Sequence, residues 1–260
     1  MPNKFTWGLY HRFVLILIGF ILLLPLLATA IYSLCQQWGA TILPSGFTLS
    51  WYQQLWQDPR FLIALGHSLL ICLGTLIISA VLIVPAVFVV FYYYPKLNTL
   101  MTVFTLLPFA IPPVVSSVGL LQLYADGPLP ITGTPWVLIG CYFTIALPFI
   151  YHAVRNNLRA LDLHSLMDAA QLLGANSIQA FIKVILPNIR KGLLSSLFLS
   201  FSFLIGEFVF ANLLVGTRYE TLQVYLYNMR QTSGHFTSAL VISYFTIVLL
   251  LTLAATRFNR

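Results

Sequence analysis

One stretch decides the interpretation of this sequence: Asp168-Ala169-Ala170-Gln171-Leu172-Leu173-Gly174, with Val184-Ile185-Leu186-Pro187 further along. Apolar residues around the first segment have the i, i+3, i+4, i+7 spacing of one helix face, namely Leu166, Ala169, Ala170 and Leu173. The same spacing recurs in a second group, namely Ile178, Phe181, Ile182 and Ile185. The pattern predicts two short amphipathic helices that form a folded elbow and present two apolar faces.

The residues between these helices are typical of helix ends. Gly174 is suited to stop the first helix, because glycine adopts the left-handed conformation that often follows a helix. Asn176 and Ser177 are residue types that cap the start of a helix. Pro187 cannot donate a backbone hydrogen bond to the preceding turn and is suited to begin a new helix.

The composition places the elbow in a membrane protein. Hydrophobic residues make up 59% of the chain and charged residues 7%, whereas a soluble domain has about 25% charged residues. The net charge of +7 does not indicate nucleic-acid binding, because the basic residues lie at the ends of apolar segments. We therefore predict an all-α, polytopic membrane protein. Its six expected transmembrane helices are residues 13–34, 62–92, 99–124, 135–154, 191–215 and 237–257.

The distribution of Lys and Arg orients these helices, because cytoplasmic loops are enriched in both. With a cytoplasmic N-terminus, the outside has only Arg60, Arg218 and Arg230. The inside then has Lys4, Arg12, Lys96, Arg155, Arg159, Lys183, Arg190, Lys191, Arg257 and Arg260. We expect both termini, and the elbow between helices 4 and 5, to be cytoplasmic. The predicted organisation is a first helix and outer loop at 1–60 and a five-helix core at 61–260, with the elbow loop at 155–190.

Four residues within the predicted spans are candidates for a translocation path. Pro108, Pro112 and Pro113 interrupt the third span, and backbone groups freed by proline survive in a membrane only inside protein or beside a wet cavity. A kinked packing helix is the alternative. Glu207 is the acidic residue placed inside a span, where we expect it to face the protein interior and be paired or protonated. It lines a path, or it makes a structural hydrogen bond to a neighbouring helix.

The remaining polar and aromatic residues have structural explanations. Cys35, Cys72 and Cys141 have no metal-ligand spacing and are expected to pack in the protein, as is His67. The outer loop at 36–60 predicts an interfacial aromatic belt or a docking surface for an external partner. Its aromatic residues are Trp38, Trp51, Tyr52 and Trp56. In the second outer loop, 216–236, residues 221–226 are expected to form a short helix. The sequence predicts no catalytic residue and no metal site.

The elbow resembles the EAA motif of permease subunits from binding-protein-dependent ABC importers. That pattern is Glu-Ala-Ala, three residues, Gly, nine residues, Ile, one residue, Leu-Pro. Here Asp168, Ala169 and Ala170 stand for the first three positions, Gly174 for the glycine, and Val184, Leu186 and Pro187 for the end. Asp for Glu and Val for Ile are conservative departures. The segment from Gly206-Glu207-Phe208 to Thr221-Leu222 also resembles permeases of the polyamine, ferric-iron, thiamine and phosphonate group, although Gln223 replaces their usual Pro.

The resemblance implies a function and a set of partners. The chain would form half of a translocation pore in the bacterial inner membrane, paired with a second permease that is expected to be a homologous, different chain. The elbow would form coupling helices that dock on a cytoplasmic ATPase dimer, through Asp168, Ala169, Ala170, Gly174, Ile178, Phe181, Leu186 and Pro187. An external binding protein would deliver the substrate. Polyamine-like cations are favoured, and phosphonate, ferric iron and thiamine are the alternatives.

Further expectations follow from this resemblance. Asp168 is expected to cap or orient the first coupling helix. We expect the flanking basic residues either to pair with acidic residues on the ATPase or only to orient the chain in the membrane. These residues are Arg155, Arg159, Lys183, Arg190 and Lys191. The chain has no Gly-x-x-x-x-Gly-Lys-Ser/Thr loop, so ATP and Mg²⁺ would be bound by the partner ATPase and no cofactor by this chain. An intramembrane enzyme and a scaffold without transport are the rival classes.

Overall fold

The computed structural model describes residues 4–125 and 129–258, and these residues are almost entirely helical. No β-strand occurs in this described part, where Cys35 and Phe47 form only an isolated antiparallel bridge. Helices suit a chain of this hydropathy, because a helix satisfies every backbone polar group within its own segment in the absence of water. The all-α prediction is confirmed.

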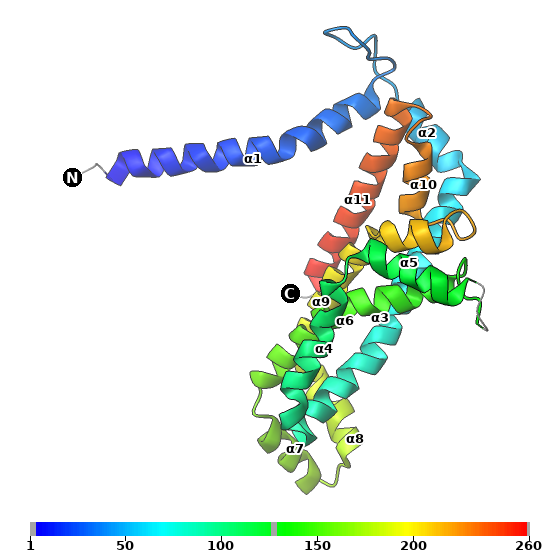
Figure 1. Ribbon diagram of the computed structural model, residues 1–260. Coiled ribbons are helices and arrows are strands. Elements are labelled where there is room, and N and C mark those ends of the chain that lie inside the picture. The colour runs from blue at the N-terminus through cyan, green and yellow to red at the C-terminus, as the bar shows by residue number, and fades with distance from the viewer. Residues whose placement is uncertain (1–3, 126–128, 259–260) are drawn as a thin grey trace. The chain divides into compact units, whose positions relative to one another are not determined.

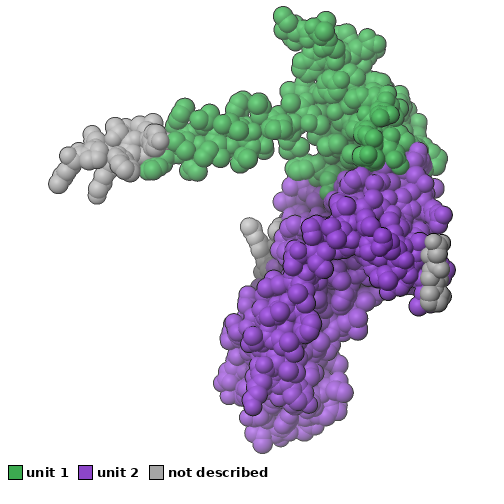
Figure 2. Space-filling model, in the orientation of Figure 1, with its two compact units in different colours: residues 1–59, 226–247 green, residues 60–225, 248–260 purple. Residues whose placement is uncertain are grey.

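The chain divides into two compact units, which Figure 2 colours separately. Unit 1 comprises residues 1–59 and 226–247, and unit 2 comprises residues 60–225 and 248–260. The first element, α1, covers Lys4–Leu34, and α2 covers Ser50–Gln57. Two late helices, α10 (Leu222–Met229) and α11 (Gly234–Phe258), contribute residues to both units.

Unit 1 contains an aromatic cluster around His235. The imidazole stacks on Tyr32 with ring centroids 4.0 Å apart and on Trp51 at 5.9 Å. The backbone N–H of Trp38 donates to Nε2 of His235 at 3.2 Å. Tyr52 joins the cluster through its hydroxyl, 2.6 Å from Oγ of Ser33. Trp38, Trp51 and Tyr52 of the predicted aromatic belt are therefore tied to the rest of unit 1 by hydrogen bonds or ring contacts.

Unit 2 is built around long helices. The first is α3 (Pro59–Tyr93), of which all but Pro59 belongs to this unit, and a 3₁₀ turn, η1 (Pro95–Leu97), follows it. Next come α4 (Asn98–Ala110), α5 (Pro113–Tyr124) and α6 (Pro135–Arg159). The elbow consists of α7 (Leu163–Leu172), α8 (Ser177–Ala180) and a π-helical turn, η2 (Phe181–Ile185). Then follow α9 (Leu186–Ile205) and a second π turn, η3 (Ala211–Val215).

The most extensive helix pair in unit 2 is formed by α6 and α9. The two helices pack tightly at Gly192, where an added Cβ would collide with the side chain of Asn157. Further along, the rings of Phe149 and Phe203 stack with centroids 4.8 Å apart. Glycine and the buried Ser196 and Ser200 of α9 permit this approach, as small residues commonly do between membrane helices.

Membrane-spanning length is found in fewer helices than the six we predicted. By length and composition, four described helices qualify: His11–Leu34, Pro59–Tyr93, Pro135–Arg159 and Gly234–Ala254. The expected span at 99–124 is not one helix, because Pro95–Ala110 and Pro113–Tyr124 meet at an angle of 90°, and it becomes a fifth span only if the bent pair is counted together. The expected span at 191–215 is divided at Gly206, where α9 has ended. Arg260 of the charge tally lies outside the described residues.

Candidate functional site

The elbow lies at one end of unit 2, where Figure 1 shows α7 and α8 gathered beyond α3, α4 and α6. Asp162 caps the start of α7, since its Oδ1 accepts a hydrogen bond from the backbone N–H of Ser165 at 3.4 Å. Hydrogen bonding to Ser165 stabilises the ionised carboxylate and lowers the pKa of Asp162. Of the two roles expected for Asp168, capping this helix was wrong, and orienting it stays a prediction. Asp168 lies in the middle of α7, because the helix begins well before the motif.

Gly174 terminates α7 as predicted. Its φ of 86° lies in the left-handed region, where side chains with a Cβ are strained. Its N–H donates to the carbonyl of Gln171 at 2.9 Å, and the N–H of Ala175 donates to the carbonyl of Ala170 at 3.0 Å. These two bonds define a Schellman motif and satisfy carbonyls that the helix end would otherwise leave unpaired.

Asn176 begins the second helix through a capping box. Its Oδ1 accepts from the backbone N–H of Gln179 at 2.8 Å, and its own N–H donates to Oε1 of Gln179 at 3.1 Å. Two backbone donors at the helix start are thereby satisfied reciprocally. The cap is Asn176 and not Ser177, which is already the first residue of α8.

The second helix continues into α9 without a break. The expectation that Pro187 starts a separate helix was therefore wrong, since Pro187 lies in the first turn of α9 and residues 177–205 are helical throughout. The π turn explains how the helix passes the proline. Proline has no N–H to donate and its ring crowds the carbonyl four residues back, which belongs to Lys183. In the wider π turn, the N–H of Leu186 bonds to the carbonyl of Phe181, five residues back, and not to the carbonyl four residues back as in an α-helix.

The predicted apolar faces are divided between the interior and the surface. In α7 the buried residues are Leu163, Met167 and Ala170, whereas Ala169 and Leu173 of the face predicted to point outward are exposed. In the second helix, Ile185 is buried and Phe181 packs on Phe88 of α3 with ring centroids 4.7 Å apart. Only part of each predicted face therefore points outward, because the other part attaches the elbow to the rest of unit 2.

Three exposed residues of the predicted faces and the neighbouring Leu172 form an apolar group that we name the elbow surface: Leu172, Leu173, Ile178 and Ile182. These side chains are 89%, 89%, 70% and 53% exposed, respectively. They come from both sides of the Gly174 turn, which brings the end of α7 beside the start of α8. Exposed apolar side chains concentrated at the tip of a folded turn are typical of a protein contact. Asp168 and Ala169 of the motif are also exposed, whereas Ala170 is buried.

The second part of the candidate site is the break between α4 and α5. The chain turns at Ile111 and Pro112, and Pro113 begins α5 at a position where its missing N–H is not needed. A cavity of about 530 Å³ lies beside the break and is lined by α4, α5, α6 and Phe210. Pro108 lies in its wall together with the aromatic residues Tyr124 and Trp136. The break predicted for this span therefore occurs at Pro112 and Pro113, whereas Pro108 lies inside α4, and a translocation path at these prolines stays a prediction.

Glu207 is half-buried and is held by backbone donors. One carboxylate oxygen accepts from the N–H of Phe210 at 2.8 Å and the other from the N–H of Ala211 at 3.1 Å. The side chain of Tyr142 on α6 lies next to the carboxylate. The carboxylate thus caps the short helix that leads into η3, beside α6. These contacts match the structural alternative, and a role for Glu207 in a path stays a prediction.

A polar cluster joins the start of α3 to the loop before α10. Arg60 makes two hydrogen bonds to Glu220, at 2.6 and 2.7 Å. The ring of His67 stacks on Tyr219 at 3.9 Å, and its Nδ1 lies 3.0 Å from the carbonyl oxygen of Glu220. His67 is therefore a packed histidine, as expected. Residues 222–229 form α10, so the predicted short helix near residues 221–226 is also confirmed.

Two features were missed by the sequence reasoning. The cap at Asp162 had a signal, since an Asp directly before an apolar helical pattern is a typical helix start. The Arg60–Glu220 pair had none, because 160 residues separate its partners. The three cysteines are free and buried, as predicted. In the described part of the chain, no group of three or more His, Cys, Asp or Glu side chains is arranged to hold a metal ion.

The comparisons with known proteins agree with this arrangement. The model of the family "Binding-protein-dependent transport system inner membrane component" matches residues 77–260, and the chain belongs to this family. A Salmonella typhimurium protein is 29% identical over 206 residues, which cover 79% of this chain and 77% of the relative. Its provisional name is 2-aminoethylphosphonate transport system permease protein PhnV.

A second relative is the spermidine/putrescine transport system permease protein PotC of Escherichia coli. It is 29% identical over 189 residues, which cover 71% of this chain and 69% of PotC. Among solved structures, the fold is similar to a chain of a bacterial ABC transporter involved in the import of the acidic polysaccharide alginate. The TM-score is 0.79 at 14% identity, with 99% of this chain and 98% of that chain covered. The chain is thus a multi-pass membrane protein of the ABC importer permease family.

Proposed function

We propose that this chain forms half of the translocation pore of an ABC importer and that its elbow surface docks on a cytoplasmic ATPase. The observation that supports this most directly is the exposure of Leu172, Leu173, Ile178 and Ile182 at the end of a rigidly capped turn. Burying each such side chain contributes about 1.5–3 kcal/mol as an upper bound. Together the four side chains provide an apolar contact that favours docking.

The rest of the assembly follows from the same proposal. ATP and Mg²⁺ are bound by the ATPase dimer, and this chain is not an enzyme. A second permease, a homologous different chain, completes the pore in the bacterial inner membrane, and an external binding protein delivers the substrate. Both termini and the elbow are cytoplasmic in this proposal, and six crossings require that the bent α4–α5 pair and α9 each complete one of them in addition to the four long helices. The Arg60–Glu220 pair supports this topology, because it brings together two residues that we assigned to the outside.

The substrate we propose is a small solute with an aliphatic ammonium group. The names of the two relatives refer to 2-aminoethylphosphonate and to spermidine and putrescine, which all contain such a group. The cavity beside the α4–α5 break supports the proposal, because Tyr124, Trp136 and Phe210 line it and aromatic rings attract cations. Polyamines remain the favoured class within this description, and an aminophosphonate is the alternative.

A single pair of variants tests the docking. Ile178→Asp places a charge on the elbow surface without touching the buried side of the elbow, and it should abolish co-purification of the ATPase and substrate uptake. The matched control is His164→Asp, which adds the same charge at an exposed position in the first turn of α7, away from the turn at Gly174. The control should retain both. If Ile178→Asp retains the ATPase, the elbow surface is not the docking site.

The rival classes and the substrate require separate measurements. Activity of the purified chain without any ATPase would support an intramembrane enzyme, and membranes that lack an associated ATPase would support a scaffold. For the substrate, uptake of labelled putrescine should be competed by other aliphatic amines and by 2-aminoethylphosphonate, and not by phosphate or sulfate. Competition by the anions alone would refute the ammonium group as the recognised feature.

A further inference from the structure

An apolar groove of about 420 Å³ runs between α3 and α9 in unit 2. All of its lining side chains are apolar, and they include Leu73, Ile77, Leu197 and Phe198. On α3 the lining extends from Leu69 to Val81, which corresponds to about 18 Å along a helix. The hydrocarbon of one membrane leaflet is about 15 Å thick, half of the core thickness. The groove therefore has the length and the chemistry of an extended acyl chain.

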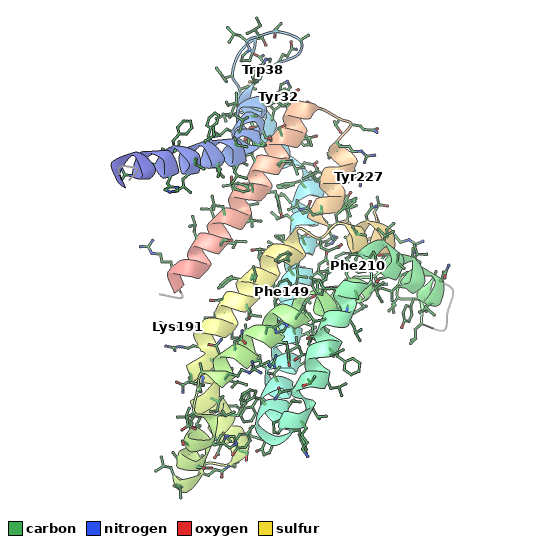
Figure 3. The ribbon with its side chains drawn as sticks, turned by 60° about the vertical axis from the view of Figure 1, so that its left-hand side comes forward. Tyr32, Trp38, Phe149, Lys191, Phe210 and Tyr227 are labelled. Carbon is green, nitrogen blue, oxygen red and sulfur yellow. The ribbon has the colours of Figure 1, made fainter. Side chains whose placement is uncertain are left out.

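The basic side chain of Lys191 lies at one end of this groove. Lys191, Leu194, Phe198 and Phe201 are spaced so that they lie on one stripe of α9, and the last three line the groove. Side chains on a helix lean toward its N-terminus, so the ammonium of Lys191 is directed away from the apolar lining. Figure 3 shows Lys191 extending outward from α9. Lys191 is exposed, and it forms no ion pair with any residue in the described ranges 4–125 and 129–258.

We infer that this groove binds one acyl chain of an anionic phospholipid whose headgroup pairs with Lys191. Inside a membrane an apolar groove gains nothing from the hydrophobic effect, because the surrounding lipid tails are equally apolar. The headgroup charge therefore decides which lipid is retained. A basic residue at the membrane surface favours an anionic lipid by electrostatic attraction.

The position of Lys191 favours a lipid over a protein helix as the occupant. An apolar helix from another chain would cover the groove but would leave the ammonium without a counter-charge. A phospholipid fits both features at once, since its chain and its anionic headgroup are joined at the membrane boundary. Lys191 directly precedes the apolar part of α9, which is where that boundary is expected. The inference does not depend on the proposed transport function.

Native mass spectrometry of the purified full-length chain, equilibrated with equal amounts of phosphatidylglycerol and phosphatidylcholine, tests the site. The wild type should retain phosphatidylglycerol in preference. Lys191→Gln should reduce this preference about five-fold, the ratio expected for one basic residue at a membrane surface. The matched control is Lys96→Gln, which removes an equal charge from an exposed residue beyond the end of α3 and should keep the preference. Ala80→Phe fills the groove and should reduce the retention of both lipids.

A second measurement keeps the inference testable if a variant folds poorly. Leu197→Trp places a fluorophore in the groove of the assembled complex, and brominated phosphatidylglycerol should quench it more than brominated phosphatidylcholine does. Two results would overturn the inference. One is an unchanged lipid preference in Lys191→Gln, and the other is a groove tryptophan that neither brominated lipid quenches, because another protein chain then covers the groove.

Discussion

Replacing Gly174 isolates the contribution of one backbone conformation to the elbow. At Gly174 φ is 86°, and a Cβ added there would meet no atom within 4 Å. Gly174→Ala therefore introduces no steric overlap with the rest of the chain, and its cost comes from the left-handed conformation alone. That conformation costs a non-glycine residue about 1–2 kcal/mol. The two hydrogen bonds of the Schellman motif depend on it, so the turn should open more often.

The expected effect is local and can be measured by hydrogen exchange. A loss of about 1–2 kcal/mol corresponds to a roughly 5–30-fold rise in the open population. Peptides that cover α7 and α8 should exchange faster by this factor, while peptides from α6 and from the apolar part of α9 remain unchanged. Under the proposed function, ATPase activity coupled to transport should fall in parallel. Gly174→Leu should abolish coupling and still allow insertion into the membrane.

Two controls separate strain from the loss of a glycine as such. Gly174→Asn should be milder than Gly174→Ala, because asparagine tolerates the left-handed region better. Gly66→Ala lies inside α3 with open space around the added methyl group and with no positive φ, so it should be neutral or slightly stabilising. Unchanged exchange of α7 and α8 in Gly174→Ala would refute the claim that the left-handed conformation holds the elbow together.

Three further predictions concern single polar groups. Glu207→Ala removes the acceptor for the N–H groups of Phe210 and Ala211 and should lower stability by about 1–2 kcal/mol in thermal unfolding. Glu207→Gln keeps one acceptor oxygen and should retain substrate uptake. Loss of uptake in a stable Glu207→Gln variant would instead favour a role in the translocation path. Glu220→Gln breaks the charge-assisted pair with Arg60 and should cost about 1–3 kcal/mol, and an unchanged melting temperature would contradict this. The pKa of Asp162 is lowered in the folded chain, so its cap stabilises α7 fully above the pKa of the unfolded chain and is lost as the pH falls through the folded pKa. The amides of α7 should therefore lose protection from hydrogen exchange in acid. Asp162→Asn should remove that pH dependence.

The elbow shows how far the sequence reasoning reached. The turn at Gly174 and the cap at Asn176 were predicted correctly, because each depends on one residue type and its immediate neighbours. The two outward faces were predicted only in part, because α7 has apolar residues on more than one side. Leu163 and Met167 turn inward while Leu172 and Leu173 remain exposed, and only packing against the rest of unit 2 makes that choice.

The interrupted spans show a similar limit. Pro112 and Pro113 predicted a break, but the 90° angle between α4 and α5 depends on which neighbouring helices receive the chain. The cost of a charge in a membrane predicted that Glu207 would be paired. It did not predict that backbone N–H groups three and four residues ahead would be the partners. The sequence thus indicates that a polar group in a membrane span needs hydrogen-bond partners, and the tertiary structure decides which groups these partners are.

The continuity of α8, the π turn and α9 bears on how force could pass through this chain. Residues 177–205 form one uninterrupted helical segment, so the side of the elbow surface that contains Ile178 and Ile182 continues directly into the apolar helix α9. The side that contains Leu172 and Leu173 is joined to the same helix only through the Gly174 turn. A partner that holds both sides would move α9 directly and α7 through a turn. In that arrangement the helical segment passes Pro187 through a π turn without a break in its backbone helix.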